Sequence, residues 1–339
     1  TGRATGHELF QNEKKSGRLV QVYLPYDTNM MMRRFIRHYR PCLCILLETE
    51  IWPNLIRQCT CHQVKLALVN ARLSERSLKK GKKIRSIMNE AARGFSVVAA
   101  QTETDANRLG QFGAGNIAVT GSVKFDIEPS ATALAKGMKL RECIGNRPVL
   151  MCASTRNGEE ARILDVLEQL DRNALLLLVP RHPQRFDDVA GLIRNRKIPM
   201  IRRSTLHDLS ANALSPDTRI LLGDSMGEMF MYYAACDIAF IGGSLEKLGG
   251  QNLIEACAVG KPVLIGPHTF NFEAITKDAI ATHAAIRITS ATELMQRANE
   301  LLSDWTLYQT MSDNARLFAE KQHGATERTL KLLIPLIEK

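Results

Sequence analysis

The sequence predicts an α/β protein with two domains, each built on a parallel sheet. Apolar runs of strand length alternate with helix-like segments along almost the whole chain, which is the pattern of parallel strands joined by helical crossovers. The 339 residues are enough for two domains of ordinary size. After residue 290 only helical patterns remain, so a helical C-terminal tail is expected.

The first series of elements predicts a domain over residues 1–125. Its strand-like runs lie at residues 20–23, 43–47, 65–69, 97–100 and 117–119. Helices fit between these runs, at residues 27–39, 53–62, 75–92 and 102–111.

A second series predicts another domain over residues 148–318. Its strands are expected at residues 148–152, 174–179, 199–202, 219–222, 237–241, 262–265 and 285–288. Residues 126–147 lack strand character and contain Gly and Pro, so we expect them to connect the domains. The helix over residues 319–339 is expected to pack back toward the first domain.

Composition limits the class of protein. The contents of 45% hydrophobic and 24% charged residues are globular values, and no run of 18 apolar residues or signal peptide is visible. What is present is therefore expected to be soluble or peripheral. Eight scattered cysteines fit a reduced compartment. Cys59-x-Cys61-His62 lacks the usual zinc spacing, so buried thiols are favoured over a metal site.

The positive charge is concentrated in the first half of the chain. Residues 1–128 hold 20 Lys and Arg against 11 Asp and Glu, whereas residues 129–339 hold 25 against 24. Two basic clusters, at residues 33–40 and 72–85, account for much of it. They are either solvated helix faces or a surface for an anionic partner, such as nucleic acid or a phosphate-bearing membrane. Only 6% aromatic residues argues against a platform that stacks single-stranded nucleic acid.

The most informative segment is IGGSLEKLGGQNLIEACAVGKPVLIGPHTFNF, at residues 241–272. Gly242–Gly243 ends a strand-like run and Gly249–Gly250 precedes a helix-like segment, and glycines allow sharp turns and close approach to a ligand. Free N–H groups and the positive end of the helix dipole suit a phosphate. Asn252 and Glu255 are three residues apart at the helix start, so both can face the same ligand.

The order GGSL, GGxN, IEA and GPHTFNF closely resembles the donor-site signature of the 3-deoxy-D-manno-octulosonic acid (Kdo) transferases. The resemblance covers essentially the whole chain. It implies the GT-B fold, with two Rossmann-like domains whose parallel sheets face a cleft. In this family the general base is a Glu in a Gly-Glu segment that lies upstream of Thr1. The catalytic residue is therefore unknown here, and the chain as given is expected to bind the donor but to transfer poorly.

Three motifs of the first domain match the family and indicate acceptor-side or cleft residues. ETEIWPN supplies Glu48 and Glu50, which either organise the acceptor site or cap the next helix. NARLS supplies Asn70 and Arg72, and the arginine either binds a lipid phosphate or carboxylate or ties loop carbonyls together. TGSVKFD supplies Lys124, which either contacts an anion of the donor or forms a salt bridge at a hinge.

In the second domain the resemblance implies a site for the donor CMP-Kdo. It assigns to that site Ser154, Thr155, Arg181, His182, Gly223, Met226, Gly227, Gly249, Gly250, Asn252 and Glu255. Arg181 is the first choice for neutralising the phosphate, and Glu255 for accepting the ribose hydroxyls.

Several of these residues also have structural interpretations. Ser154 and Thr155 fit an ordinary helix cap, His182 fits a hydrogen-bonded loop histidine, and the GDSMGE turn fits a tight loop capped by aspartate. Asn252 and Glu255 also fit a capping pair.

Three positions depart from the family pattern. Arg156 stands where a His is expected, Asn157 where a Glu is usual, and Gln251 where a His precedes the Asn. These changes bear on affinity for the donor more than on its class.

The sequence thus predicts a metal-independent, inverting transferase without cofactor that moves Kdo from CMP-Kdo to lipid IVA, the anionic lipid A precursor. Its expected place is the cytoplasmic face of the bacterial inner membrane. The alternatives are another GT-B enzyme that uses a UDP-sugar, or a non-catalytic nucleotide-binding remnant. Nucleic acid is not an expected partner.

Overall fold

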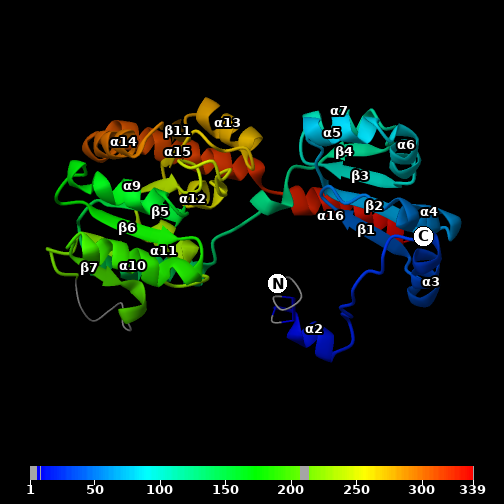
Figure 1. Cartoon of the computed structure of the whole chain (residues 1–339), viewed down its shortest axis with the longest axis horizontal. Coiled ribbons are helices and arrows are strands. Elements are labelled where there is room, and N and C mark those ends of the chain that lie inside the picture. The colour runs from blue at the N-terminus through cyan, green and yellow to red at the C-terminus, as the bar shows by residue number, and fades with distance from the viewer. Residues whose placement is uncertain (1–5, 8, 207–213, 339) are drawn as a thin grey trace. The chain divides into compact units, whose positions relative to one another are not determined.

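The computed structural model describes residues 6–7, 9–206 and 214–338, and the chain divides into two compact units (Figure 1). Unit 1 comprises Thr1–Val123 and Gly324–Lys339, and unit 2 comprises Lys124–His323. Each unit holds its own parallel sheet. The predicted α/β class is therefore confirmed.

Unit 1 contains a four-stranded parallel sheet in the order β1-β2-β3-β4. Right-handed helical crossovers between neighbouring parallel strands explain this simple order. The strands are β1 (Leu43–Leu47), β2 (Lys65–Ala71), β3 (Val97–Ala100) and β4 (Ile117–Val119).

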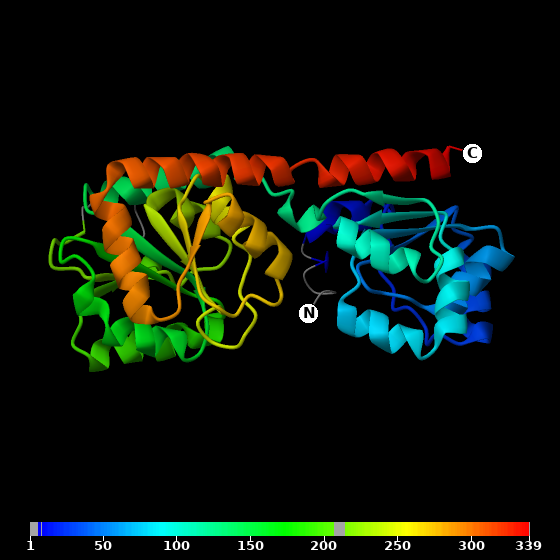
Figure 2. The ribbon, with the colours of Figure 1, turned by 90° about the horizontal axis from the view of Figure 1, so that it is seen from above.

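Helices cover both faces of this sheet. The main core lies on one face, where α3 to α7 pack, and α16 (the red helix of Figure 2) packs on the other, where Leu333 meets Ala67, Val69 and Val97. The helices of unit 1 are α2 (Gln11–Lys15), α3 (Asn29–Tyr39), α4 (Pro53–Cys61), α5 (Glu75–Lys82), α6 (Arg85–Arg93), α7 (Glu103–Gly110) and α16 (Ala325–Ile337).

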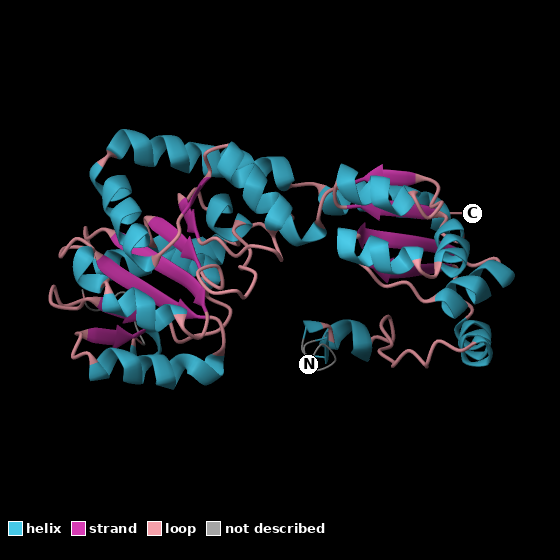
Figure 3. Cartoon of the chain, turned by 45° about the horizontal axis from the view of Figure 1, so that its top comes forward, coloured by secondary structure: helices cyan, strands magenta, loops and turns pink. Residues whose placement is uncertain are grey.

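Unit 2 contains a seven-stranded parallel sheet in the order β11-β10-β9-β5-β6-β8-β7. Figure 3 shows these strands side by side, with helices packed around them. They are β5 (Val149–Thr155), β6 (Leu175–Pro180), β7 (Met200–Arg202), β8 (Ile220–Leu222), β9 (Ile238–Ile241), β10 (Val263–Ile265) and β11 (Ala285–Arg287).

Side chains alternate between the two faces of a strand, and helices cover both faces of this sheet. Successive side chains of these strands therefore pack in two separate hydrophobic cores. Helices α8, α11, α12, α13 and α15 pack on one face, and α9, α10 and α14 on the other. The α-helices are α8 (Ala131–Ile144), α9 (Glu159–Asp165), α10 (Phe186–Asn195), α11 (Met229–Ala235), α12 (Ile254–Ala258), α13 (Glu273–Ala281), α14 (Ala291–Ser303) and α15 (Trp305–Gln322). Short 3₁₀ turns are η1 (Val123–Phe125), η2 (Leu167–Gln169), η3 (Pro183–Arg185) and η4 (Arg203–Thr205).

Two predictions for the first domain were wrong in detail. Residues 20–23 form no strand, and Val20 and Tyr23 are largely exposed. A β-rich composition makes a strand only where a neighbouring strand pairs with it. The helix predicted over 75–92 is divided into α5 and α6 by the turn at 83–84.

Two segments near the predicted domain boundaries lie differently from the sequence-based expectation. Residues 126–147, expected as a connection, contain α8, whose Leu140 and Ile144 are part of the core of unit 2. The C-terminal helical region breaks at His323–Gly324. Therefore α15 belongs to unit 2, and only α16 belongs to unit 1.

Candidate functional site

Most of the residues predicted for the donor site meet at one edge of the sheet of unit 2. Strands β5, β6, β8 and β9 are parallel neighbours, so the loops that follow them leave the same carboxyl edge. This edge is the usual ligand position in open α/β sheets. The loops contain the motifs STRNGEE, PRHPQR, GDSMGE and GGSLEKLGGQN in that order along the chain.

The buried carboxylate of Glu159 holds the first glycine pair in place. Its Oε2 accepts hydrogen bonds from the main-chain N–H of Gly243 (2.6 Å) and Arg156 (2.9 Å), and its Oε1 from those of Ser244 (3.0 Å) and Leu245 (2.9 Å). These N–H groups are already engaged. The N–H of Gly243 is therefore taken up by the fold and is not available to a phosphate.

Close packing explains why glycine occupies this turn. A Cβ added to Gly242 would lie 2.6 Å from the carbonyl oxygen of Ser154, and Gly243 has a φ of +69°. Both the approach of the two loops and the left-handed backbone exclude larger residues. Sequence reasoning missed Glu159 as an organiser of the site, because three of its four partners lie more than 80 residues away.

The second glycine pair starts the segment that leads into α12. Gly249 and Gly250 have φ values of +91° and +75°, and the N–H of Gly250 donates to the carbonyl of Gly243 at 2.7 Å. The Asn252 side chain accepts from the N–H of Ile254 at 3.1 Å, so it forms an Asx turn just before α12, whose N-cap is Leu253.

Glu255 does not close a capping pair with Asn252. Its carboxylate forms no hydrogen bond to any described residue, although the side chain is half-buried. Burial raises the pKa of Glu255, and the positive charge of Arg181 opposes that rise. Half-buried acceptor oxygens without a protein partner are suited to a ligand with hydroxyl donors.

Arg181 and His182 follow β6 and have exposed side chains. The Arg181 main chain is fixed to the neighbouring loop, where its N–H donates to the Thr155 carbonyl at 3.0 Å. Desolvation and the nearby charges of Arg156, Arg181 and Arg185 lower the pKa of His182. The loop therefore presents a positive field beside the half-buried carboxylate of Glu255, as a site for a ligand with an anion and hydroxyl donors requires.

A buried ion pair joins the β5 and β6 loops. Arg185 donates to Glu160 Oε2 at 3.1 Å and to Asn157 Oδ1 at 2.6 Å. Burial raises the pKa of Glu160, and Arg185 opposes the rise. Thr155 is fully buried and its hydroxyl has no partner among the described atoms, whereas Ser154 is half-buried with a φ of +54°. Of these two predicted ligands, Ser154 is the more accessible.

The GDSMGE loop is held by its aspartate. Asp224 accepts hydrogen bonds from Arg202 Nε (2.6 Å), the Ser204 N–H (2.8 Å) and the Ser204 hydroxyl (2.6 Å). Gly223 is packed tightly, whereas Met226 and Gly227 are exposed at the tip of the loop. The aspartate is thus structural, and the exposed tip holds the two predicted residues that a ligand can reach.

We expect Asp224→Asn to lower the unfolding free energy by about 1–3 kcal/mol at pH 7, because it weakens these charge-assisted bonds. Burial acts to raise the pKa of Asp224, but the bonds from Ser204 and Arg202 hold it below the ordinary value. A lowered carboxyl pKa stabilises the fold above the ordinary value of about 3.9 and ceases to do so as the pH falls through the folded-state value.

Urea unfolding at pH 7 and at decreasing pH measures this effect. The difference in unfolding free energy between wild type and Asp224→Asn should narrow only below about pH 5. Asp217→Asn is the matched control, because Asp217 is exposed and, among the described residues, only its main-chain N–H forms a hydrogen bond. Equal stability of the two variants at pH 7 would contradict the assigned role of Asp224.

The predicted acceptor-side residues of unit 1 follow β1 and β2. Glu48 has a φ of +59°, and the exposed Glu50 accepts a hydrogen bond from Trp52 Nε1 at 3.0 Å. Asn70 is buried, and its Oδ1 accepts from the Val123 N–H at 3.2 Å. Asn70 therefore ties the carboxyl end of β2 to Val123, where the first stretch of unit 1 ends.

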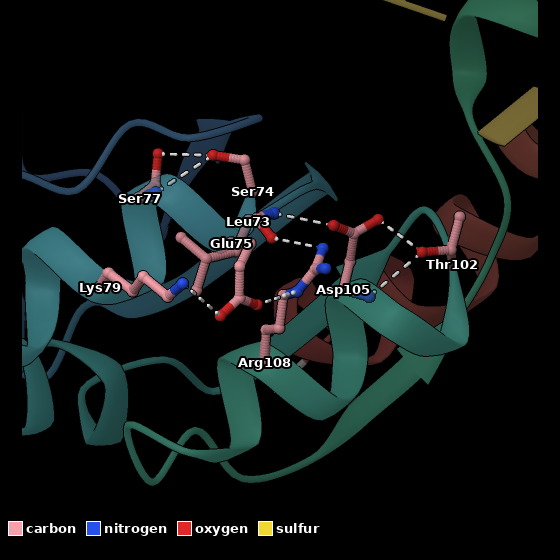
Figure 4. A network of polar contacts seen from close by, with 8 residues as sticks. All are labelled: Leu73, Ser74, Glu75, Ser77, Lys79, Thr102, Asp105 and Arg108. Atoms are coloured by element: carbon pink, nitrogen blue, oxygen red, sulfur yellow. Dashed lines mark hydrogen bonds and ion pairs between the residues drawn. The ribbon is translucent and has the colours of Figure 1, made fainter. Parts of the chain in front are cut away.

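The loop that carries Arg72 is supported by a polar network (Figure 4). Asp105 accepts from the Leu73 N–H at 2.8 Å, and Arg108 donates to the Leu73 carbonyl at 3.1 Å. Ser74 caps α5, and Glu75 pairs with Arg108 and Lys79. Arg108, not Arg72, binds a loop carbonyl, and Arg72 is exposed.

Other predicted features are placed as follows. Lys124 is exposed in η1, at the start of unit 2. In the described ranges no helix has the length and apolar character needed to cross a bilayer, and no set of three or more His, Cys, Asp or Glu is arranged around a metal position. Cys59 is buried, as expected of a structural thiol, whereas Cys61 is exposed, so the expectation was wrong for Cys61.

Comparison with known proteins identifies the family. Residues 1–127 match the family model described as "3-Deoxy-D-manno-octulosonic-acid transferase (kdotransferase)", and residues 165–318 match "Glycosyl transferases group 1". The 3-deoxy-D-manno-octulosonic acid transferase of Bordetella pertussis is 42% identical, over 98% of this chain and 78% of the relative. The chain belongs to the Kdo transferase family. It is therefore a glycosyltransferase.

Further comparisons agree with this Kdo transferase assignment. The enzyme of Haemophilus influenzae is 38% identical over 95% of this chain and 76% of its own length. The C-terminal CMP-Kdo binding domain of WaaA from Acinetobacter baumannii is 29% identical with a TM-score of 0.52, covering 56% of this chain and 98% of that domain. Anabaena HepE with bound UDP shares the fold alone, at 15% identity and a TM-score of 0.58, over 91% of this chain and 82% of that one.

Proposed function

We propose that this transferase takes Kdo from CMP-Kdo and attaches it to lipid IVA during lipopolysaccharide synthesis. The observation that carries the proposal is the exposed arginine and histidine loop beside a half-buried, unpaired Glu255 at the carboxyl edge of the sheet. This pair of features fits a nucleoside monophosphate, with positive charge for the phosphate and acceptor oxygens for the ribose. The likeness of unit 2 to a CMP-Kdo binding domain supports the same donor.

The proposed reaction is a single displacement with inversion. The acceptor hydroxyl loses its proton to a carboxylate base and attacks the anomeric carbon while CMP departs. Negative charge grows on the departing phosphate, and we assign Arg181 as the charge that stabilises it. His182 is assigned as a neutral hydrogen-bond donor, because its lowered pKa disfavours the imidazolium form. In this scheme the basic side chains supply the charge that a metal ion supplies in other transferases, and the proposal is metal-independent.

The acceptor side of the proposal rests on unit 1. Arg72 is exposed on its supported loop and suits a phosphate of the lipid. Helix α3 exposes Arg33, Arg34 and Arg37 together with Met30 and Met31. A helix that exposes both basic and apolar side chains suits an anionic bilayer surface, so we place the enzyme at the cytoplasmic face of the inner membrane.

Calorimetric titration with CMP tests the donor assignment, with UDP as the competing nucleotide and EDTA in both cells. We expect CMP to bind and UDP to bind about tenfold more weakly, because a site matched to cytosine leaves a polar group unpaired against uracil, a loss of the order of one hydrogen bond. Glu255→Ala should abolish measurable CMP binding through loss of the ribose contacts, which are worth roughly 1.5–3 kcal/mol each when charge-assisted.

Glu300→Ala provides the control, since Glu300 lies on α14 with an exposed side chain that pairs only with Arg297. Preference for UDP would instead select a UDP-sugar enzyme. A folded chain that binds neither nucleotide would support the remnant interpretation. Dependence of CMP binding on added metal would contradict the metal-independent scheme.

A further inference from the structure

Two of the three positions that depart from the family pattern meet at one glycine. A Cβ added to Gly243 would lie 3.5 Å from Cγ of Arg156 and 3.4 Å from Nε2 of Gln251. Arg156 follows β5, whereas Gln251 follows the second glycine pair, so the two side chains approach this position from different loops. The stem of the Arg156 side chain and the amide N–H₂ of Gln251 therefore border the same small space.

The carboxylates around Arg156 are committed to other groups. Glu159 accepts main-chain N–H groups with both oxygens, Glu160 pairs with a different arginine, and Glu246 pairs with Arg162 at 2.9 Å. In the described part of unit 2 the Arg156 guanidinium forms no ion pair or hydrogen bond. Because the side chain is only half-buried, its charge is available to an external anion.

This cation lies beside the proposed phosphate position. Arg156 and Arg181 both act on His182, whose pKa they lower, so the two guanidinium groups share one electrostatic environment. Two like charges at one edge repel each other, and a ligand with two anionic groups relieves that repulsion. A CMP-linked 2-keto sugar acid has this character, because its phosphate and its carboxylate are attached to the same anomeric carbon.

We propose that Arg156 and Gln251 form a second anion subsite that binds the sugar carboxylate of the donor, next to the phosphate position at Arg181. This inference rests on the proposed function. It makes Arg156 a residue that distinguishes keto-acid sugar donors from nucleotides that carry a neutral group on the phosphate.

The test compares two cytidine ligands that differ in the carboxylate. Freshly prepared CMP-Kdo carries it, and the methyl ester of CMP has the same singly charged phosphodiester without it. The wild-type chain should bind CMP-Kdo about tenfold more tightly than the methyl ester, the order expected for one charge-assisted contact. Arg156→Gln should remove that advantage and leave the affinity for the methyl ester within about twofold.

Companion variants sharpen the result. Arg156→Lys should keep part of the preference, because it keeps the charge but loses the paired N–H donors. Gln251→Ala should reduce the preference by about threefold, as one neutral hydrogen bond is lost. Both changes leave the main-chain hydrogen bond of Arg156 to Glu159 intact, and circular dichroism should show wild-type folding.

Three outcomes would overturn the inference. Arg156→Gln weakens both ligands equally, in which case Arg156 serves the phosphate. Arg156→Gln changes neither affinity, in which case the sugar carboxylate binds elsewhere. If Lys124→Gln then weakens CMP-Kdo but not the methyl ester, the carboxylate binds at Lys124. Failure of the wild-type chain to bind either ligand would contradict the proposed function itself, and is thereby distinct from the first two results.

Discussion

Arg181→Ala is expected to lower kcat/KM for Kdo transfer by about 10²- to 10³-fold, the usual effect of removing one donor that stabilises developing charge. The side chain is exposed and forms no hydrogen bond or ion pair to described residues, so the substitution should not disturb the fold. Only its main-chain N–H has a structural partner, and alanine retains that group. The measurement is the steady-state rate of Kdo transfer to lipid IVA. It is made with a preparation in which the wild-type enzyme is active.

The control for this loss is Arg194→Ala. Arg194 is equally exposed, on α10 of the same unit, and its side chain has no partner among the described residues. Arg194→Ala removes the same charge as Arg181→Ala, at a position outside the proposed site. Arg181→Lys should recover part of the rate, because it restores charge without the bidentate geometry. If Arg181→Ala transfers Kdo as fast as Arg194→Ala, Arg181 does not contact the leaving phosphate.

Glu159→Ala is expected to reduce the unfolding free energy of the chain by about 3–5 kcal/mol, because four main-chain N–H groups lose a buried acceptor. Few single substitutions at a protein surface approach this size. Glu159→Gln should cause an intermediate loss of unfolding free energy. The carbonyl oxygen of the glutamine side chain still accepts hydrogen bonds, but its N–H₂ group faces other donors. Urea unfolding followed by circular dichroism gives both values.

Glu168→Ala controls for loss of a carboxylate from the same region, because Glu168 is exposed and unpaired in the described structure. A second consequence separates Glu159 from an ordinary core residue. The loop it holds also carries the carbonyl of Gly243 that fixes Gly250, so CMP binding should weaken at denaturant concentrations where the fold persists. An unfolding midpoint for Glu159→Ala equal to that of Glu168→Ala would refute the role of this carboxylate.

The strands of both sheets were largely predictable because their signal is local. A parallel strand that is covered on both faces is apolar along its whole length. Short apolar runs such as LLLLV at 175–179 therefore favour a buried strand. The run at 20–23 had similar composition and failed. Whether such a run becomes a strand depends on a neighbour that pairs with it, and the neighbour is not encoded in the run itself.

The glycine-rich signature shows the same division within the site. The sequence by itself determined the family, the order of the loops and the residue types that reach the carboxyl edge. It did not determine which main-chain N–H groups stay free, because Glu159 lies 84 residues before Gly243 and takes them only after β5 and β9 pair.

Tertiary structure alone also decided between interpretations that the motifs left open. Arg108, not Arg72, binds the Leu73 carbonyl, and Asn252 forms a turn before α12 while Glu255 has no hydrogen-bond partner among the described residues. Short motifs fix which side chains are available, since they act through local backbone geometry. Which of them are consumed by the fold and which are left for a ligand depends on partners far away in sequence, because every buried polar group must find one.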